Sequence, residues 1–326
     1  MRPRQKSLLL LASVRIANLP SVVSNVWLGI LMGWEASQLT APITPPWAAA
    51  AQLSLAGILL YVAGNFLNDW HDRNWDAQHR PERALPQGAF SPALYLFLAI
   101  FCGAAGVIVA GLNGPGSALV ALTIALCVVI YTRWHKQAAW TVLVMGLCRG
   151  LLPLLFFIEW PPRARCLTAT TLFGDRINLL AAFTPIPLAL VLYVAGLSLL
   201  ARCESQAAPP ARIRWLARSM LVLSGLSMAS VWLQANPVFG LLGLVPFALW
   251  LTLCFTRFGK SPRTQIPALL AGLPLLDWIL MAPDALIHVI DARGICVHIP
   301  FPLTCLLLPP LAFVSGRLLQ RVAAAT

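Results

Sequence analysis

The chain has 326 residues and a mean hydropathy of +0.78, and 59% of its residues are hydrophobic while 10% are charged. Too few polar side chains are present to cover a soluble globule, so the composition excludes a soluble protein. The formal net charge of +12 does not indicate nucleic-acid binding, because the basic residues are scattered in short loops between apolar blocks. We therefore expect membrane lipids, and no nucleic acid, among the partners.

The apolar residues form continuous blocks of about 20 residues, the length with which a helix crosses a bilayer. These blocks are rich in Leu and Ala and lack the alternation of a membrane β-barrel, so they predict an all-α polytopic membrane protein. Two of the weaker blocks could be re-entrant or interfacial, which leaves nine spans as an alternative to ten. In chain order, the expected spans are 13–34, 47–68, 91–112, 115–132, 139–158, 179–201, 213–234, 237–256, 264–283 and 299–317.

Arginine and lysine residues fall mostly on one side of these spans. The excess of positive charge on that side predicts a cytoplasmic N-terminus, and we expect the bacterial inner membrane. The loops after spans 47–68, 115–132 and 179–201 would then meet in a cytoplasmic polar cap. The predicted outside loops hold only Arg163, Arg165, Arg176 and Arg293, whereas the inside segments hold Arg2, Arg4, Lys6, Arg73, Arg80, Arg83, Arg133, Lys136, Arg202, Arg212, Arg214, Arg218, Arg257, Lys260, Arg263, Arg317 and Arg321.

An acidic segment follows the span 47–68. Asn68, Asp72 and Asp76 are spaced four apart, so their side chains share one face of a helix. Oxygen ligands of this kind suit a hard cation such as Mg²⁺, and the guanidinium groups of Arg80 and Arg83 suit phosphate oxygens. The pattern predicts a site for metal and diphosphate at the membrane surface. The alternative is a solvated loop in which the acidic residues balance the nearby arginines.

Residues 68–83 read Asn-Asp-x-x-Asp-x-x-x-Asp-x-x-x-Arg-Pro-x-Arg, which resembles the first signature of the UbiA-type intramembrane prenyltransferases. The segments 15–18, 131–136 and 149–153 also resemble parts of that family. The resemblance implies one domain over residues 1–326, in which nine or ten helices form a ring around a lipid-open central cavity with a cytoplasmic polar cap.

The resemblance also implies a reaction. Asn68, Asp72 and Asp76 would hold Mg²⁺ on an isoprenyl diphosphate, while Arg80 and Arg83 engage its phosphates. Breaking the allylic C–O bond leaves a carbocation and a highly charged diphosphate, which Mg²⁺ and arginines stabilise. The apolar cavity would shield the cation from water until the isoprenyl group reaches a lipophilic or aromatic acceptor.

Other candidate residues lie in later blocks. Arg149 sits within the apolar block 139–158, where an arginine must face a cavity, a ligand or a partner. We expect a contact with diphosphate, and the alternative is a structural pair with a buried acid such as Asp277. Tyr131 and Lys136 could also reach the diphosphate. The family spacing places a lysine where this chain has His135, so Lys136 could instead be only a positively charged membrane anchor.

The segment 192–205 departs from the family pattern. A second aspartate-rich motif is expected there, but this chain has one carboxylate, Glu204, close to Arg202. The variant resembles the EboC-like branch of the superfamily. Arg202 could neutralise phosphate directly, with Glu204 as an orienting partner or a single metal ligand. Alternatively, this loop has lost its catalytic role.

Two other functions compete with prenyl transfer. The missing second motif leaves open a catalytically altered relative that binds or transports a prenyl lipid or hydrophobic metabolite. CDP-alcohol phosphotransferases also use spaced aspartates, but this chain lacks the Asp-Gly and Ala-Arg residues that lead into their motif. The leading prediction is therefore a Mg²⁺-dependent membrane prenyltransferase.

Overall fold

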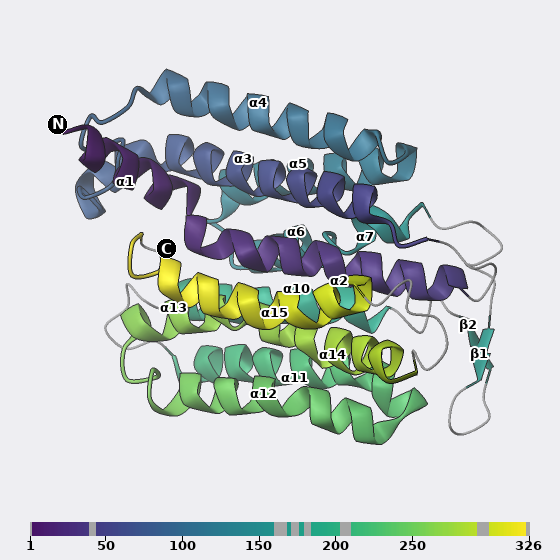
Figure 1. Ribbon diagram of the computed structural model, residues 1–326. Coiled ribbons are helices and arrows are strands. Elements are labelled where there is room, and N and C mark those ends of the chain that lie inside the picture. Colours follow the sequence, from purple (N-terminus) through teal and green to yellow (C-terminus); the bar gives the residue numbers. More distant parts are fainter. Residues whose placement is uncertain are drawn as a thin grey trace.

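The computed structural model describes residues 2–38, 44–159, 168–170, 176–178, 184–202, 210–291 and 300–323. Its long helices lie roughly parallel or antiparallel, side by side, and both chain termini lie at the same end of the bundle (Figure 1). The first half contains α1 (Pro3–Val14), the 3₁₀ turn η1 (Ile16–Asn18), α2 (Leu19–Gln38), α3 (Trp47–His79), α4 (Pro92–Gly111), α5 (Pro115–Trp134), α6 (Thr141–Gly150) and α7 (Leu154–Phe157).

The second half begins with a small antiparallel sheet that the sequence did not predict. Strand β1 (Thr168–Thr170) pairs with β2 (Arg176–Asn178), with Thr168 opposite Asn178. The sheet lies at the end of the bundle away from the termini (Figure 1). The remaining helices are α10 (Pro185–Arg202), α11 (Ala211–Ala235), α12 (Pro237–Thr256), α13 (Pro262–Ala271), α14 (Leu273–Asp291) and α15 (Pro300–Leu319).

Proline and serine residues mark where several of these helices begin. Pro92, Pro115, Pro237 and Pro262 occupy first-turn positions, where a missing backbone N–H costs nothing. At α4, the Ser91 side chain also accepts a hydrogen bond of 3.2 Å from the backbone N–H of Leu94. These local signals separate the apolar blocks into individual helices.

The prediction of a polytopic helical membrane protein is confirmed. In the described residues, eight helical segments are long and apolar enough to cross a membrane, compared with the nine or ten spans expected for the whole chain. The block 139–158 is interrupted, because α6 ends at Gly150 and a turn with Pro153 separates it from α7. The block 213–234 is helical within α11 but falls outside the eight, since its sequence contains arginines and several serines.

The apolar side chains divide between an interior and an outer face. Helix α2 lies inside, with Val22, Leu28 and Ile30 fully buried. Helices α4, α5 and α12 expose large apolar residues, such as Ile100 at 64% and Leu122 at 57%. Outer faces of this kind are stable against lipid rather than water, which agrees with the membrane assignment.

Candidate functional site

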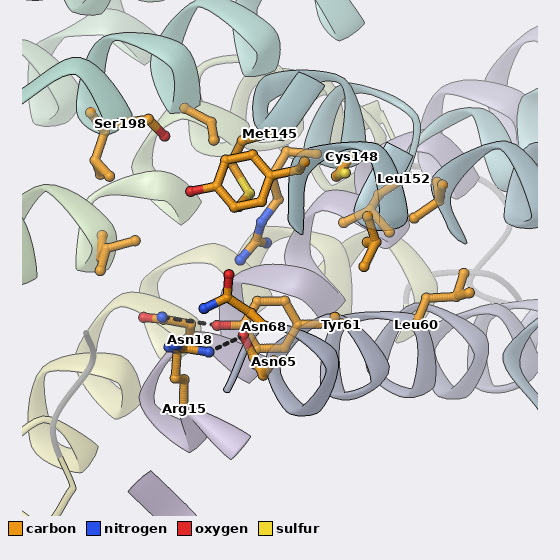
Figure 2. A pocket seen from close by; sticks show the side chains of 18 of the residues that line it. Arg15, Asn18, Leu60, Tyr61, Asn65, Asn68, Met145, Cys148, Leu152 and Ser198 are labelled. Atoms are coloured by element: carbon orange, nitrogen blue, oxygen red, sulfur yellow. Dashed lines mark hydrogen bonds between the residues drawn. The ribbon is translucent and has the colours of Figure 1, made fainter. Parts of the chain in front are cut away.

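A cavity of about 270 Å³ lies within the bundle, between α3, α5, α6, α10 and the junction of α13 and α14. Most of its wall is apolar, with Leu60, Ile124 and Leu152 among the lining residues. Polar side chains gather at one part of the wall, where Arg15, Asn18, Asn65 and Asn68 lie close together (Figure 2). The cavity therefore offers a hydrophobic volume with a polar end.

Helix α3 leads from this cavity to the acidic residues. At 33 residues it is about 50 Å long by the standard helical rise, and so exceeds a bilayer core of about 30 Å. Asn68 lines the cavity, and Asp72 and Asp76 follow on the next two turns of α3. Asp72 and Asp76 do not line the cavity themselves. Their carboxyl groups are nonetheless buried, at 6% and 2% exposure.

Asn68, Asp72 and Asp76 form a row along α3, called the acidic row below. Two oxygen atoms in this row lack hydrogen-bond partners among the described residues. They are Oδ1 of Asn68 and Oδ1 of Asp76, both buried. A buried oxygen without a partner is costly, and a bound cation would compensate for it. The described residues contain no cluster of three His, Cys, Asp or Glu side chains arranged for a metal. The row fits a divalent cation only with the Asn68 amide oxygen as one of its ligands.

Asp72 is surrounded by basic groups. Lys136 Nζ lies 2.8 Å from Asp72 Oδ1, and His135 Nε2 lies 3.2 Å from Asp72 Oδ2. His71 Nδ1 lies 3.3 Å from Oδ1. The structure therefore brings both His135 and Lys136 to the acidic row, although they are adjacent in sequence and only one was expected at that position.

Asp69 and Asp76 share Arg83. The Arg83 Nη1 atom lies 2.8 Å from Asp76 Oδ2 and 3.5 Å from Asp69 Oδ1. Arg83 thus lies between two carboxylates. Arg80 ends α3, with its backbone N–H bonded to the carbonyl oxygen of Asp76 at 2.8 Å. Its side chain makes no ion pair among the described residues and is half-buried.

Arg15 is a site residue that the sequence analysis did not select. It adopts the left-handed conformation (φ 51°, ψ 52°) between α1 and η1. Its Nη1 donates to Asn65 Oδ1 at 2.6 Å, and its Nη2 lies 3.2 Å from Asp69 Oδ1. Its charge is thus balanced by the carboxylate of Asp69. A charged residue inside the predicted span 13–34 was the signal that could have identified it.

Arg149 lies in the cavity wall and is also linked to the buried acid considered from the sequence. It lines the cavity and is buried, with its guanidinium 5.3 Å from the centre of the Tyr61 ring. It also donates from Nη1 to Asn25 Oδ1 at 2.9 Å. The Asn25 amide in turn donates to both carboxylate oxygens of Asp277, at 2.9 and 2.8 Å. The expected link to Asp277 therefore exists, through Asn25.

Arg202 and Tyr131 lie at the polar end of α10 and α5. Tyr131 lines the cavity and stacks on His135 with 5.1 Å between ring centres. Arg202 Nη1 donates to the carbonyl oxygens of His135 and Ala138, the latter at 3.1 Å. Arg202 is thus bound to the turn between α5 and α6. Glu204 lies outside the described residues.

Further polar groups in the cavity wall were missed. Asn18 Nδ2 donates to the Tyr61 hydroxyl at 3.0 Å, and Ser198 contributes a hydroxyl from α10. The signal was present on α3, because Tyr61, Asn65 and Asn68 recur at spacings of four and three and so continue the acidic face into the membrane. Applying helical spacing upstream of Asn68 would have found Tyr61 and Asn65, but not Asn18 or Ser198, which lie on other helical elements.

Comparison with known proteins relates the site to one family. Residues 26–159 match the model of the UbiA prenyltransferase family. A digeranylgeranylglyceryl phosphate synthase of Methanothrix thermoacetophila is 35% identical over 81 residues, which cover 25% of this chain and 30% of that protein. A protoheme IX farnesyltransferase of Methylobacterium radiotolerans is 32% identical over 138 residues, or 41% of this chain and 42% of the relative. The chain therefore spans less than half the length of these curated relatives.

The fold is similar over a larger part of the chain. The apo structure of a UbiA homolog from Aeropyrum pernix K1 superposes with a TM-score of 0.60, covering 81% of this chain and 96% of the other. The sequence identity of that pair is 15%. The common architecture thus extends well beyond the region of recognisable sequence similarity.

Proposed function

We propose that the chain belongs to the UbiA prenyltransferase family, which its residues 26–159 match, and that it transfers an isoprenyl group from an isoprenyl diphosphate to a lipophilic acceptor within the membrane. The observation that carries the proposal is the continuity of α3. The same helix lines an apolar cavity at Leu60 and presents buried carboxylates at Asp72 and Asp76. A substrate with a hydrocarbon tail and a diphosphate head would match these two environments.

In this proposal, Asn68, Asp72 and Asp76 hold Mg²⁺ at the diphosphate. The two buried oxygens without partners on Asn68 and Asp76 support that assignment. Mg²⁺ would supply positive charge to the diphosphate as it leaves. In this proposal Glu204 either orients Arg202 or is the single ligand of a second metal ion. The number of metal ions depends on which of these roles Glu204 has.

The basic residues would orient the diphosphate and stabilise its charge. Arg80 has no competing ion pair in the described structure, so it would bind phosphate directly. Arg149 lines the cavity from α6. Arg83 and Lys136 would reach phosphate by leaving their carboxylate partners. Arg202 would add positive charge beside the phosphate while its Nη1 stays bound to the turn.

The cavity wall would protect the allylic cation. Tyr61 and Tyr131 both line it, and the faces of aromatic rings attract cations. Apolar lining residues exclude water, which would otherwise capture the cation. The acceptor would enter from the lipid, through a ring of helices open to the bilayer. In this proposal the polar end of the bundle and the N-terminus face the cytoplasm of a bacterial inner membrane.

A second candidate function is the binding or transport of a prenyl lipid without transfer. It is favoured by Arg202, which binds backbone carbonyls where a second metal motif was expected. Membership of the EboC-like branch would agree with either function.

One experiment separates the two functions. Purified protein in lipid nanodiscs is incubated with Mg²⁺, a host lipid extract and labelled geranyl, farnesyl or geranylgeranyl diphosphate. Prenyl transfer yields a prenylated lipid by mass spectrometry and an equal amount of diphosphate. Binding of the labelled substrate with neither product would reject the transferase and support the carrier.

A further inference from the structure

The turn between α5 and α6 is held at both sides. On one side, Arg202 at the end of α10 donates from a single nitrogen to the carbonyl oxygens of His135 and Ala138. On the other side, His135 and Lys136 contact Asp72 of α3. Helices α10 and α3 are thus connected through this turn, at the polar end of the cavity lined by Tyr131 and Ser198.

The Lys136 side chain contacts two residues of α3. Its ammonium group lies 2.8 Å from Asp72 Oδ1 and 4.3 Å from the centre of the Trp75 ring. Asp72 is buried, whereas the Lys136 side chain remains 35% exposed. The partly exposed ammonium of Lys136 therefore occupies an oxygen of a buried carboxylate.

We propose that Arg202 is a positioning residue that holds Lys136 on Asp72, so that the ammonium group competes with the divalent cation for this carboxylate. The proposal rests on the proposed function, because it takes Asp72 as a ligand of that cation. When the cation binds, Lys136 leaves Oδ1 while Arg202 keeps the backbone of the turn in place. The released ammonium then remains beside the diphosphate head.

The contacts explain why Arg202 would matter for this exchange. The Arg202 Nη1 atom bonds two carbonyl oxygens, and the planar guanidinium holds that nitrogen in place more rigidly than the flexible stem of a lysine would, so it restrains both ends of the segment 135–138. Lysine at position 202 would keep the charge but lose the fixed geometry. Without that restraint the turn is free to move, and Lys136 spends less time at Asp72. Arg202 thus acts through Lys136 rather than by touching the cation.

The test measures binding of Mn²⁺ by electron paramagnetic resonance, in nanodiscs and without substrate. Lys136→Met removes the competing ammonium, and we expect the dissociation constant for Mn²⁺ to fall by about three- to fivefold. Arg202→Lys should lower it in the same direction although the charge is unchanged. In the Lys136→Met background, Arg202→Lys should have no further effect, because the two residues act in series.

Arg133→Met is the matched control for a general loss of positive charge. Arg133 is exposed, lies next to the same turn and makes no ion pair among the described residues. We expect wild-type affinity for this variant. If Lys136→Met binds Mn²⁺ no more tightly than Arg133→Met, competition by Lys136 is rejected. If Arg202→Lys matches wild type, or changes the affinity equally in the presence and absence of Lys136, the positioning role is rejected.

The proposed function fails in a different way. A wild-type protein that binds no Mn²⁺ would overturn both the metal site and the competition. If wild-type protein binds Mn²⁺, Asp72→Asn abolishes that binding and Lys136→Met leaves the dissociation constant unchanged, the metal site is retained. Only the inference about Lys136 is then overturned. A melting temperature for each variant shows whether the fold is intact.

Discussion

Arg149 is tied to Asp277 through a single amide side chain. Asn25 accepts a hydrogen bond from Arg149 Nη1 and donates to both carboxylate oxygens of Asp277, while Ser24 donates to the same carboxylate. Asp277 is fully buried and Arg149 nearly so. The guanidinium of Arg149 on α6 and the carboxylate of Asp277 on α14 are thus connected through Asn25 on α2.

Replacing Asp277 by asparagine should destabilise the protein. The new amide would present a donor to the donating amide of Asn25 and would leave Arg149 without its counter-charge. We expect a loss of about 3 kcal/mol, seen as a lower midpoint of thermal unfolding in detergent. Arg149→Met combined with Asp277→Asn should lose less than the sum of the two single variants. Additive losses would show that the two residues are independent.

Substitution in the acidic row should stop catalysis and leave the fold intact. Asp72→Asn or Asp76→Asn removes a negative charge from the proposed cation site. We expect Mg²⁺-dependent release of diphosphate in membranes to fall by more than about 100-fold. Glu82→Gln is the control, because Glu82 is an exposed acid just beyond α3. Turnover that is unchanged in both aspartate variants would reject the metal assignment.

The length of the accepted isoprenyl chain should depend on the cavity wall of α5. Val128 lines the cavity, whereas the adjacent Val129 is 52% exposed on the outer face. Val128→Phe should reduce kcat/KM for geranylgeranyl diphosphate relative to geranyl diphosphate by about tenfold, since the added volume removes room for the tail. Val129→Phe should leave the ratio unchanged. Equal ratios in both variants would mean that the tail lies elsewhere.

Replacing Arg15 by lysine should lower the stability of the protein. One ammonium group cannot bond both Asn65 and Asp69 in the geometry of the guanidinium. We expect Arg15→Lys to lower the stability by about 1 kcal/mol, measured as a shift in the thermal midpoint. Arg4→Lys, an exposed substitution in α1, is the reference. Identical midpoints for the two variants would show that the bidentate contact does not contribute.

Local patterns predicted the parts of the site that lie on one helix. The four-residue spacing of Asn68, Asp72 and Asp76 places them on one face wherever a helix forms, and α3 provides that helix. The same reasoning failed where the pattern was incomplete. The block 139–158 is largely apolar but contains Pro153, and there the regular helix is interrupted between α6 and α7.

The sequence by itself determined the membrane environment, the helical class and the acidic row, because composition and short-range periodicity are properties of neighbouring residues. Only the tertiary structure decided which basic side chains contact which carboxylates. Arg15 meets Asp69, Lys136 meets Asp72, and Arg149 reaches Asp277 through Asn25. The partners in these contacts are separated by tens to hundreds of residues, and their pairing depends on how the helices pack. No local rule orders that packing, since it follows from the fit of apolar faces along the whole bundle.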